Sequence, residues 1–540
     1  TQSDTEVLLK ACMSRGARAL DALRGMFAFA WWNPRTRRVL LARDRVGIKP
    51  LYWTVCERGG RRALLFASEV RALLASGLVE RRIDPVALES FLWNGFSVGP
   101  RTFVAGVGLL PAGASLDVDL DARTGPGVTF WAPSATPGDS RDPGRLRAEL
   151  LEAMRIHQIA DVPLGVFLSG GVDSSAMTAL AARSTRGSVR TFNIGFAEAE
   201  FDEAPHARAV AAAIGTEHTE IKLTESDFRS QLGDALGCID QPTFDALNTY
   251  FVSRAVREAG ITVALAGTGG DELFGGYASF RDLPRVAAAG RALAALPDGL
   301  LRGGSSAVNA LLRNSAAGVP AQTRWGKLGD ALCARGDLLQ LYQLAYALFT
   351  PSFLQSLYPS LGRTEFGLPP ERAVELRARA GSHVELHGIS LYELALFLGE
   401  RLLRDTDTAS MAVALEVRVP LVDHRVVEET LALEPATRFA PLGRKQLLRT
   451  LGLEGLDPAL FERPKRGFVL PIGVWCRRHL SGQVAETLGD TETCRSLGLD
   501  PRVVARLWAA FQAGSRGVYW SRVWALFVLL RWCRQHRLAL

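Results

Sequence analysis

The sequence predicts an α/β protein: a parallel sheet with helices on both faces, preceded by a smaller α+β domain. Three observations predict this. Helix and strand patterns alternate from residue 145 onward, two glycine-rich segments each follow an apolar strand, and a stretch rich in Pro, Ser, Gly and Asp at 132–144 follows a block of short β-type runs. Such alternation is typical of parallel strands covered by helices. We therefore expect one domain over 1–131, a linker over 132–144 and a second domain over 145–540.

The composition is that of an ordinary globular chain. Of 540 residues, 48% are hydrophobic and 22% are charged, with a net charge of +7 that comes mainly from dispersed Arg. Because no dense basic block occurs, we expect no nucleic-acid or membrane partner. The seven Cys lack Cys-x-x-Cys spacing, which favours reduced thiols in a cytoplasmic protein. The apolar run Val523–Leu530 is too short to cross a bilayer and predicts a buried helix.

The front block combines one helical segment with short strands. Residues 5–24 have a helical period that ends at Gly25. Turn residues then separate β-type runs at Phe27–Trp32, Val39–Ala42, Leu51–Val55, Ala63–Ala67 and Ser115–Leu120. Short runs separated by turns predict an α+β block with mostly antiparallel strands.

The second part alternates helix and strand. We expect helices at Arg145–Ala160, Ser174–Ser184, Glu203–Ile214 and Asn248–Ala259, and strands at Pro163–Leu168, Val189–Phe196, Glu217–Leu223 and Thr262–Ala266. Beyond about residue 281 the pattern is mainly helical and rich in Ala and Leu. Ligands of parallel sheets bind at the carboxyl ends of strands, so segments that follow the strands are candidates for a site.

The first candidate is Leu168-Ser169-Gly170-Gly171-Val172-Asp173-Ser174-Ser175, which follows a strand and opens a helix. The two glycines allow a tight turn and close approach of a ligand to the backbone. The helix start offers unpaired N–H groups, and the serines add hydroxyl donors, an arrangement suited to pyrophosphate. Asp173 among phosphate donors implies Mg²⁺. The alternative is a Gly-Gly turn in which Ser caps the helix.

The second candidate, Gly267–Tyr277, has the sequence GTGGDELFGGY and also follows an apolar strand. Its glycines bracket Asp271 and Glu272 at the carboxyl end of a predicted parallel strand. Two such loops on one sheet face the same edge, so Asp173 and Asp271 are expected to share Mg²⁺ bound to one triphosphate. The alternative is a glycine-rich turn with solvated acids, which the joint occurrence of both loops makes weak.

Taken together, these segments resemble a known family. The first loop is similar to the pyrophosphate loop of N-type ATP pyrophosphatases, and both loops resemble the synthetase domain of glutamine-dependent asparagine synthetases. Further matching stretches are Asp161–Gly165, Leu403–Asp407, Ser410–Ala412, Leu415–Asp423 and Arg463–Phe468. The resemblance implies an adenine nucleotide α-hydrolase-like domain. Such a domain uses ATP to activate a carboxylate as an acyl-AMP, from which ammonia forms an amide.

The resemblance also implies roles for individual residues. Lys465 would stabilise charge at the α-phosphate, as a fixed cation in a closed site does. Thr268 and Asp271 would complete the catalytic group. Nucleotide contacts would come from Leu168, Ser169, Gly170, Gly171, Asp173, Ser174, Ser175, Ile194, Gly267, Gly269 and Gly270, with Asp173 and Asp271 as Mg²⁺ ligands. A structural ion-pair role is favoured for three charges in an apolar helical context, Arg404, Asp405 and Arg418.

Residues 1–131 resemble the later part of a class II glutamine amidotransferase domain. The matching stretches are Ser3–Val7, Gly25–Ala30, Ala42–Tyr52 and Ala67–Glu69. Asp4 matches the residue that binds the α-amino group of glutamine in that family. The family's N-terminal Cys nucleophile has no match, because the chain opens with Thr1 and Cys12 lies in a helical pattern. We therefore expect a truncated domain, with ammonia-dependent synthesis but no glutamine hydrolysis, and we include a homodimer among the expected assemblies.

The sequence leaves the acceptor acid open. Ala266 and Thr268 stand where the family often has a serine and an acid, and Gln241 stands where it often has Glu. L-Aspartate is the first hypothesis for the acceptor. An amide or lactam synthetase for another carboxylate, such as a natural-product or cell-envelope acid, is the second. A catalytically inactive nucleotide-binding homologue is the third, against which the intact acids and lysine of the motifs argue.

Overall fold

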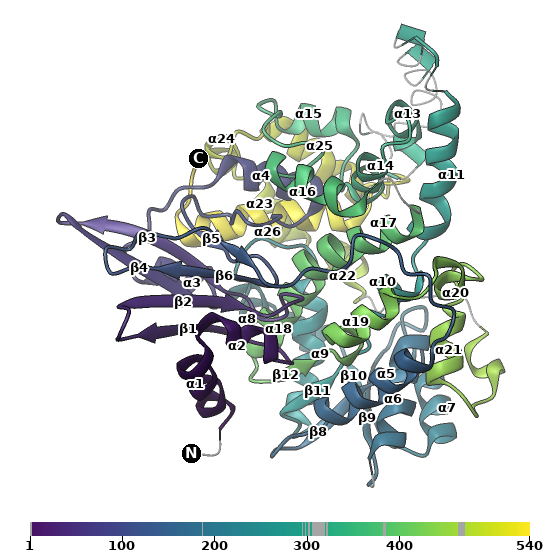
Figure 1. Ribbon diagram of the computed structural model, residues 1–540. Coiled ribbons are helices and arrows are strands. Elements are labelled where there is room, and N and C mark those ends of the chain that lie inside the picture. Colours follow the sequence, from purple (N-terminus) through teal and green to yellow (C-terminus); the bar gives the residue numbers. More distant parts are fainter. Residues whose placement is uncertain are drawn as a thin grey trace.

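The protein has a β-rich front part and a larger α/β part, shown in Figure 1 as a computed structural model. The structure describes residues 3–185, 187–293, 325–381, 385–462 and 470–540, together with short pieces at 295–297, 299–300, 303–304, 319 and 322–323.

The front part contains two antiparallel sheets. One has the strand order β1-β2-β6-β7, and the other has the order β4-β3-β5. The strands are β1 Ala28–Asn33, β2 Arg38–Arg43, β3 Tyr52–Arg58, β4 Arg61–Ala67, β5 Gly108–Leu109, β6 Ala114–Val118 and β7 Val128–Thr129. The predicted antiparallel strands are confirmed. The sequence missed β5 and β7 because strands of 2 residues carry no alternating pattern.

Two of the front helices begin and end at recognisable caps. The helical pattern over 5–24 is confirmed as α1 (Asp4–Arg15), the turn η1 (Gly16–Arg18) and α2 (Ala19–Ala22). Helices α3 (Val70–Ala75) and α4 (Pro85–Asn94) follow β4 and were not predicted. Asp84 caps the start of α4 and Gly95, in a left-handed conformation, ends it. Because α4 is buried on almost every side, it lacks the polar stripe by which a helix is found in a sequence.

The larger part is built on a parallel sheet of order β10-β9-β8-β11-β12. Its strands are β8 Leu164–Phe167, β9 Arg190–Phe196, β10 Glu217–Leu223, β11 Val263–Leu265 and β12 Glu416–Arg418. The four predicted strands are confirmed. The helical context expected for Arg418 was wrong, because Arg418 lies on the edge strand β12 and pairs with Glu416 at 2.6 Å. Pairing with β11 imposes the extended conformation on this short segment, which tertiary context decides more than propensity.

Helices cover both faces of this sheet, as predicted. Val166 and Leu265 pack in one core with α5, α6 and α7. Phe192, Ala264 and Val417 point to the opposite face, where they pack against α9. The covering helices are α5 Gly144–His157, α6 Val172–Ser184 and α7 Ala204–Ile214 on the first face, and α8 Glu225–Gly237, α9 Ala246–Glu258 and α18 Arg404–Met411 on the second.

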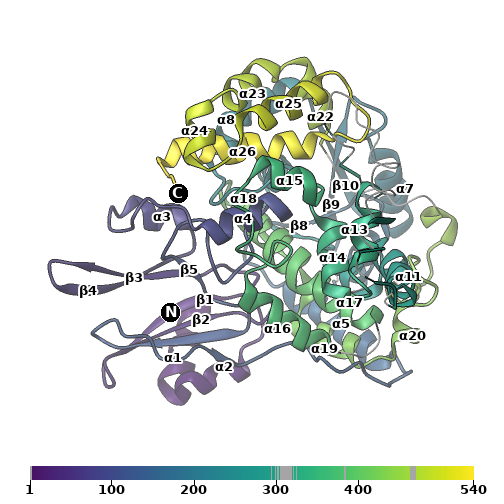
Figure 2. The same cartoon turned by 90° about the horizontal axis from the view of Figure 1, so that it is seen from above.

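The rest of the chain is mainly helical in its described residues, as expected. Its elements are α10 Gly270–Phe274, α11 Ser279–Ala292, η2 Trp325–Lys327, α13 Leu328–Cys333, α14 Leu338–Tyr346, α15 Pro351–Leu357, α16 Pro370–Ala380, α17 Glu385–Tyr392, the π-helix η3 Glu393–Leu403, η4 Pro420–Val422, α19 His424–Leu431, α20 Pro435–Phe439, α21 Gln446–Gly452, η5 Pro458–Phe461, α22 Ile472–Arg478, α23 Ser481–Leu488, α24 Thr491–Ser496, α25 Pro501–Gln512 and α26 Trp520–His536. The C-terminal group α22–α26 packs beside α3, α4 and α8 (Figure 2). The buried helix predicted around Val523–Leu530 is confirmed as α26. None of the helices in the described part of the chain has both the length and the apolar character needed to cross a bilayer.

Polar contacts join the two parts of the molecule. Lys49 Nζ lies 2.7 Å from Asp407 Oδ1 on α18. On the same helix, the Arg404 side chain donates to the Ser97 carbonyl oxygen of the front part at 2.9 Å. Within the larger part, Asp405 accepts from the Thr243 hydroxyl at 2.8 Å. These contacts give Arg404 and Asp405 structural partners.

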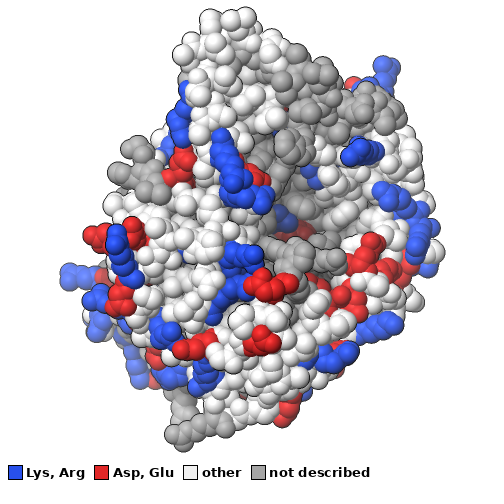
Figure 3. Space-filling view, turned by 90° about the vertical axis from the view of Figure 1, so that its right-hand side faces the viewer, with Lys and Arg blue, Asp and Glu red and all other residues white. Residues whose placement is uncertain are grey.

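Positive and negative groups are interspersed on the molecular face drawn in Figure 3. That face has a hollow near its middle, and neither sign of charge forms a continuous patch across it.

Candidate active site

The candidate site lies where β8 and β11 end side by side. The chain runs outward from β8 through β9 and β10 and returns to β11 on the other side of β8. Val166 lies opposite Leu265, so the loops that follow the two strands start next to each other. A reversal of strand order of this kind opens a crevice at the carboxyl edge of the sheet, where ligands bind.

The first loop turns sharply into α6. Gly170 has φ +74°, and a Cβ there would lie 2.8 Å from the backbone carbon of His206, so only glycine fits without a shift. The Ser169 and Ser174 hydroxyls lie 3.1 Å apart, and the Ser169 N–H donates to the Ser174 hydroxyl at 3.2 Å. Gly171 is the N-cap of α6, whose first turn has N–H groups without helical partners. Hydroxyls and N–H groups are thus gathered at one turn.

The second loop packs directly on the first. A Cβ on Gly270 would lie 2.5 Å from the carboxyl carbon of Asp173, and a Cβ on Gly267 would lie 2.9 Å from the backbone carbon of Asp173. Gly269 has φ +107°, and its Cβ would lie 2.4 Å from Val422 Cγ1. Larger residues at these positions would push the loops apart. The glycines therefore set the close approach of the two loops.

Lys445 joins the two acids. Its Nζ lies 2.6 Å from Asp173 Oδ1 and 2.7 Å from Asp271 Oδ1, with 8% of the lysine side chain exposed. Burial by itself lowers the pKa of Lys445, but the two carboxylates outweigh burial and raise this pKa above its ordinary value. The ammonium is therefore charged, and both loops converge on a single cation.

The sequence patterns missed Lys445. It lies 272 residues from Asp173 and 174 residues from Asp271 and precedes α21 with φ +48°, outside both glycine-rich loops. The one signal that pointed to it was the scarcity of lysine in a chain rich in Arg, and that signal applies equally to every lysine.

Both loops line one cavity of about 410 Å³, a size typical of small-molecule sites. The predicted site residues on its wall are Leu168, Ser169, Asp173, Ser174, Ile194, Gly267, Thr268, Gly269 and Asp271. The other glycines of the prediction, Gly170, Gly171 and Gly270, shape the loops without being among the described lining residues. Ser175 is fully buried behind the first loop, and its hydroxyl has no hydrogen-bond partner in the described residues.

Two predicted residues are not among the described lining of this cavity. Lys465 lies outside the described residues. Asp4 lies at the exposed start of α1, where its carboxylate accepts from the Thr5 N–H at 2.7 Å. Figure 1 shows α1 and α21 on opposite sides of the molecule.

The cavity has an apolar wall and an acidic wall. Its larger apolar members are Phe167, Phe192, Ile194, Val252, Val256 and Val417. Its charged members, within the described chain, are Asp173, Asp245, Asp271 and Glu272. Asp245 Oδ2 lies 2.5 Å from an Arg401 guanidinium nitrogen, and this guanidinium lies 4.5 Å from the centre of the Phe244 ring. An apolar wall beside acids suits a flat base and a metal-bound phosphate chain.

One acid of this wall, Glu272, and a neighbouring acid, Glu393, are buried. Glu272 is 1% exposed and accepts from the Tyr277 hydroxyl at 2.8 Å. Burial first, and then the charge of Asp271, raise the pKa of Glu272 to about 8. Burial likewise raises the pKa of Glu393, on η3, to about 7. Glu393 accepts three hydroxyl hydrogen bonds, from Ser279, Tyr342 and Tyr346.

The two acids at the loop junction suit a hard cation. Carboxylate oxygens are the ligands that Mg²⁺ prefers, and Asp173 and Asp271 already hold the Lys445 ammonium between them, which stands in for a bound cation. No group of three or more potential metal ligands occurs among the residues that the structure describes. A metal with two protein ligands takes its remaining ligands from phosphate and water, as Mg²⁺ commonly does.

A doubly wound sheet with a nucleotide-sized cavity at its switch point, walled by a glycine-serine loop and paired acids, defines the class of nucleotide-dependent α/β enzymes. Within this class, the chain belongs to the asparagine synthase family, whose model matches residues 145–534. The model of the glutamine amidotransferase domain matches residues 1–131. ATP-dependent asparagine synthesis is the activity of the family.

Curated relatives agree with this membership. The chain is 29% identical over 515 residues to asparagine synthetase [glutamine-hydrolyzing] 1 of Bacillus subtilis, which covers 91% of this chain and 75% of the relative. It is 30% identical over 551 residues to a putative asparagine synthetase [glutamine-hydrolyzing] of Mycobacterium bovis, covering 98% of this chain and 80% of the relative. A shorter match, 31% identical over 302 residues, is to amidase chyE of Penicillium rubens and covers 52% of this chain and 44% of that protein.

Proposed function

We propose that this chain activates the side-chain carboxylate of L-aspartate as aspartyl-AMP and converts it with ammonia into asparagine. The observation that carries the proposal is the convergence of Asp173 and Asp271 on one cation at the edge of a single nucleotide-sized cavity. In the first step a carboxylate oxygen bonds to the α-phosphorus of ATP, and the bond from this phosphorus to the pyrophosphate oxygen breaks. In the second step ammonia attacks the acyl carbon, AMP leaves and the nitrogen releases a proton.

In this proposal the first loop holds the departing pyrophosphate. The Ser169 and Ser174 hydroxyls and the N–H groups at the start of α6 donate to phosphate oxygens, and Gly170 and Gly171 let the phosphate approach the backbone. Ile194 and the apolar wall receive the adenine, while backbone groups of Leu168 and Gly267 bind its edge and the ribose. The side chain of Ser175 is buried, so in this proposal the residue shapes the backbone of the first loop and does not contact phosphate through its hydroxyl.

Asp173 and Asp271 hold Mg²⁺ when the nucleotide is bound. The metal supplies charge neutralisation on the phosphate chain and makes pyrophosphate a better leaving group. Lys445, which bridges the two carboxylates, keeps them close together and offers a third charged group to the same phosphates. Lys465 and Thr268 act at the α-phosphate in this proposal, where a fixed donor is worth several kcal/mol of transition-state stabilisation.

The proposal is tested by pyrophosphate release with ATP, MgCl₂ and ammonium chloride across a panel of carboxylic acids. We expect release that depends on L-aspartate and a stoichiometric yield of asparagine and AMP. Asp173→Asn and Asp271→Asn should each raise the Mg²⁺ concentration needed for half-maximal release. Glu492→Gln, an exposed acid on α24, serves as the matched control. Nucleotide binding without turnover on any acid would support an inactive homologue instead.

A second candidate is amide or lactam formation on another carboxylate. The described wall of the cavity carries acidic side chains but no lysine or arginine that could bind the α-carboxylate of aspartate. In addition, Thr268 stands where an acid is frequent in the family. One protein to which the chain is similar is named as an amidase. Pyrophosphate release with a non-amino carboxylic acid, and none with L-aspartate, would favour this candidate.

The remaining expectations also stay proposals. We propose a division into two domains at 132–144, small-molecule substrates without a nucleic-acid or membrane partner, a cytoplasmic location and a homodimer. Glutamine as the ammonia source in the intact protein, with Asp4 at its α-amino group, belongs to the same set. Ammonia suffices for the test above, so that test does not depend on them.

A further inference from the structure

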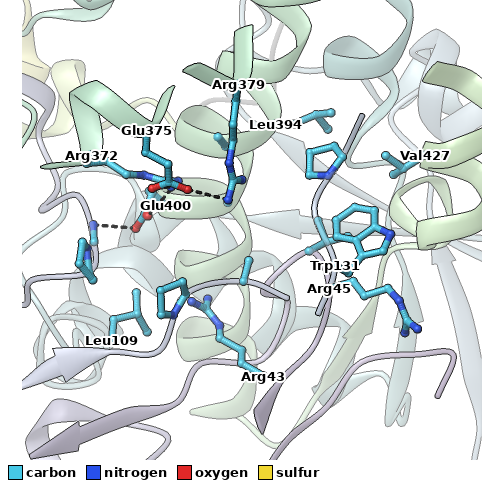
Figure 4. Close-up of a pocket in the computed structure, with 18 of the residues that line it drawn as sticks. Arg43, Arg45, Leu109, Trp131, Arg372, Glu375, Arg379, Leu394, Glu400 and Val427 are labelled. Carbon is cyan, nitrogen blue, oxygen red and sulfur yellow. Dashed lines mark hydrogen bonds and ion pairs between the residues drawn. The ribbon is translucent and has the colours of Figure 1, made fainter. Parts of the chain in front are cut away.

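A second cavity, of about 200 Å³, lies between the front part and the helices of the larger part (Figure 4). Its wall combines residues of the front part, among them Arg43, Arg45 and Trp131, with residues of α16, η3 and α19. No described residue lines both this cavity and the nucleotide cavity. The roles proposed above leave this second cavity without a function.

Two buried guanidinium groups on the front wall have no carboxylate partner in the described residues. Arg43 is 4% exposed, and burial lowers its pKa. Arg45 is 8% exposed, and burial lowers its pKa as well. Both side chains donate only to backbone oxygens, those of Gly47, Lys49 and Leu110 for Arg43 and those of Leu20, Asp21 and Leu23 for Arg45. Carbonyl oxygens satisfy these N–H groups. Nearby carboxylates that form no hydrogen bond with these side chains, Asp44 and Glu400 for Arg43 and Glu428 and Asp21 for Arg45, do not outweigh the effect of burial.

The opposite wall shares two carboxylates among its guanidinium groups. Glu375 pairs with Arg372 and with Arg379, at 2.6 Å in each case (Figure 4). Glu400 lies 4.0 Å from Arg372 and accepts from the Gly99 N–H at 3.1 Å. The Arg372 Nε is buried without a hydrogen-bond partner among the described residues. A third lining acid, Glu371, is turned to Arg101 at 3.2 Å. The described wall of this cavity thus carries four guanidinium groups against three carboxylates.

The far end of the cavity is apolar. Trp131, Leu394 and Val427 form this end in Figure 4, beyond Arg379. The Trp131 indole N–H is already used, because it donates to Glu428 at 2.6 Å. An occupant complementary to both ends has one anionic group and an apolar body, and the volume limits it to about the size of an amino acid.

We propose that this cavity binds a small organic carboxylate with an apolar body and that its occupancy changes nucleotide affinity. The link to the nucleotide is η3. Leu394 and Glu400 of this helix line the second cavity, whereas Leu402 lines the nucleotide cavity. A ligand that shifts η3 therefore acts on both walls, and the coupling between the two binding events is reciprocal. π-Helical segments such as η3 are frequent at functional sites.

Calorimetry with phenylacetate, phenethyl alcohol and phenethylamine tests the site. We expect phenylacetate to bind about tenfold more tightly than the alcohol, since a charge-assisted hydrogen bond is lost in the alcohol. Arg379→Met should remove this advantage, whereas Arg229→Met, at an exposed position on α8, should keep it. Equal binding of the acid and the alcohol would overturn the assignment. So would full phenylacetate affinity in Arg379→Met, because the carboxylate would then bind elsewhere, for example at the acceptor site of the nucleotide cavity.

A cavity-filling variant tests the coupling. Val427→Phe should fill the cavity and abolish phenylacetate binding. If thermal unfolding shows that this variant does not fold, Ala112→Leu, which fills the same cavity, is used in its place. In the wild type, saturating phenylacetate should change the Kd of a non-hydrolysable ATP analogue several-fold, and in the filled variant it should not. An unchanged Kd in the wild type would refute the effector role, and a Kd that changes equally in the filled variant would place the carboxylate elsewhere.

Discussion

Lys445 decides the electrostatics of the candidate site at the scale of single residues. Two carboxylates as close as Asp173 and Asp271 repel each other unless a cation lies between them, and the Lys445 ammonium is that cation in the structure. In the proposed mechanism, a magnesium nucleotide would bring a second cation to the same acids. Lys445 could then donate to the phosphates. We therefore propose that it both keeps the two carboxylates together and binds phosphate.

Replacement of Lys445 tests this role. We expect Lys445→Met to lower the rate of pyrophosphate release about 100-fold or more, because a preorganised charge in a closed site is lost. Lys222→Met, at an exposed position on β10, is the matched control and should keep the wild-type rate. Pyrophosphate release by Lys445→Met at the rate of the control would show that the lysine is only structural.

Gly270 offers a test of the close approach of the loops. A methyl group there would lie 2.5 Å from the Asp173 carboxyl carbon, so Gly270→Ala should displace the acid and reduce pyrophosphate release. Overpacking of this kind typically costs about 1–3 kcal/mol of unfolding free energy. Gly233→Ala, inside α8 with no atom within 4 Å of the added group, should be neutral or slightly stabilising. Equal activity and equal urea midpoints for the two variants would contradict the packing of the loops.

At the scale of elements, the sequence predicted most of the strands and helices that surround the candidate site. β10 spans Glu217–Leu223, as its pattern predicted, and α6, α7 and α9 differ from expectation by a few residues at their ends. The helices α3, α4 and α8 and the strands β5, β7 and β12 were missed. Of these, α8 has a local signal, the capping box of Thr224 and Asp227, whereas α4 lacks a polar stripe. α4 is buried all round, and β12 is extended because β11 pairs with it from a distant part of the chain. Such elements are defined by tertiary contacts that a local pattern does not contain.

The π-helix η3 is tied to α11 and α14 through Glu393, and this tie depends on pH. The pKa of Glu393 is raised by burial to about 7, so the folded state holds its proton more tightly than the unfolded state. The contribution of Glu393 to the free energy of unfolding is therefore complete below the unfolded pKa near 4.5, and it is lost as pH rises through 7. We expect urea unfolding free energies of the wild type to fall relative to Glu393→Gln between about pH 5 and pH 8.

The size of this effect follows from the shift. A displacement of more than one pKa unit corresponds to more than about 1.4 kcal/mol. Glu492→Gln, which removes an exposed acid on α24, should leave the pH dependence of the wild type intact. A difference between wild type and Glu393→Gln that stays constant over this pH range would contradict the raised pKa.

At the scale of the whole molecule, topology brings the site together. Asp173 and Asp271 lie 98 positions apart by their numbers, yet their loops meet because β8 and β11 are neighbours across the switch point. The sequence predicted both loops and their meeting, since glycine-rich turns after apolar strands have a local signature and parallel strands share an edge. It did not predict Lys445 or the cavity between the two parts, because these depend on which distant surfaces pack together.

The most direct test of the shared site is to locate the metal. Crystals grown with MnCl₂ and a non-hydrolysable ATP analogue would give an anomalous peak for Mn²⁺, which binds the same oxygen ligands as Mg²⁺. We expect one peak within coordination distance of both Asp173 and Asp271, with the phosphate chain along the first loop. A nucleotide-bound Mn²⁺ that contacts neither carboxylate would contradict the central claim that the two loops close on a single metal nucleotide.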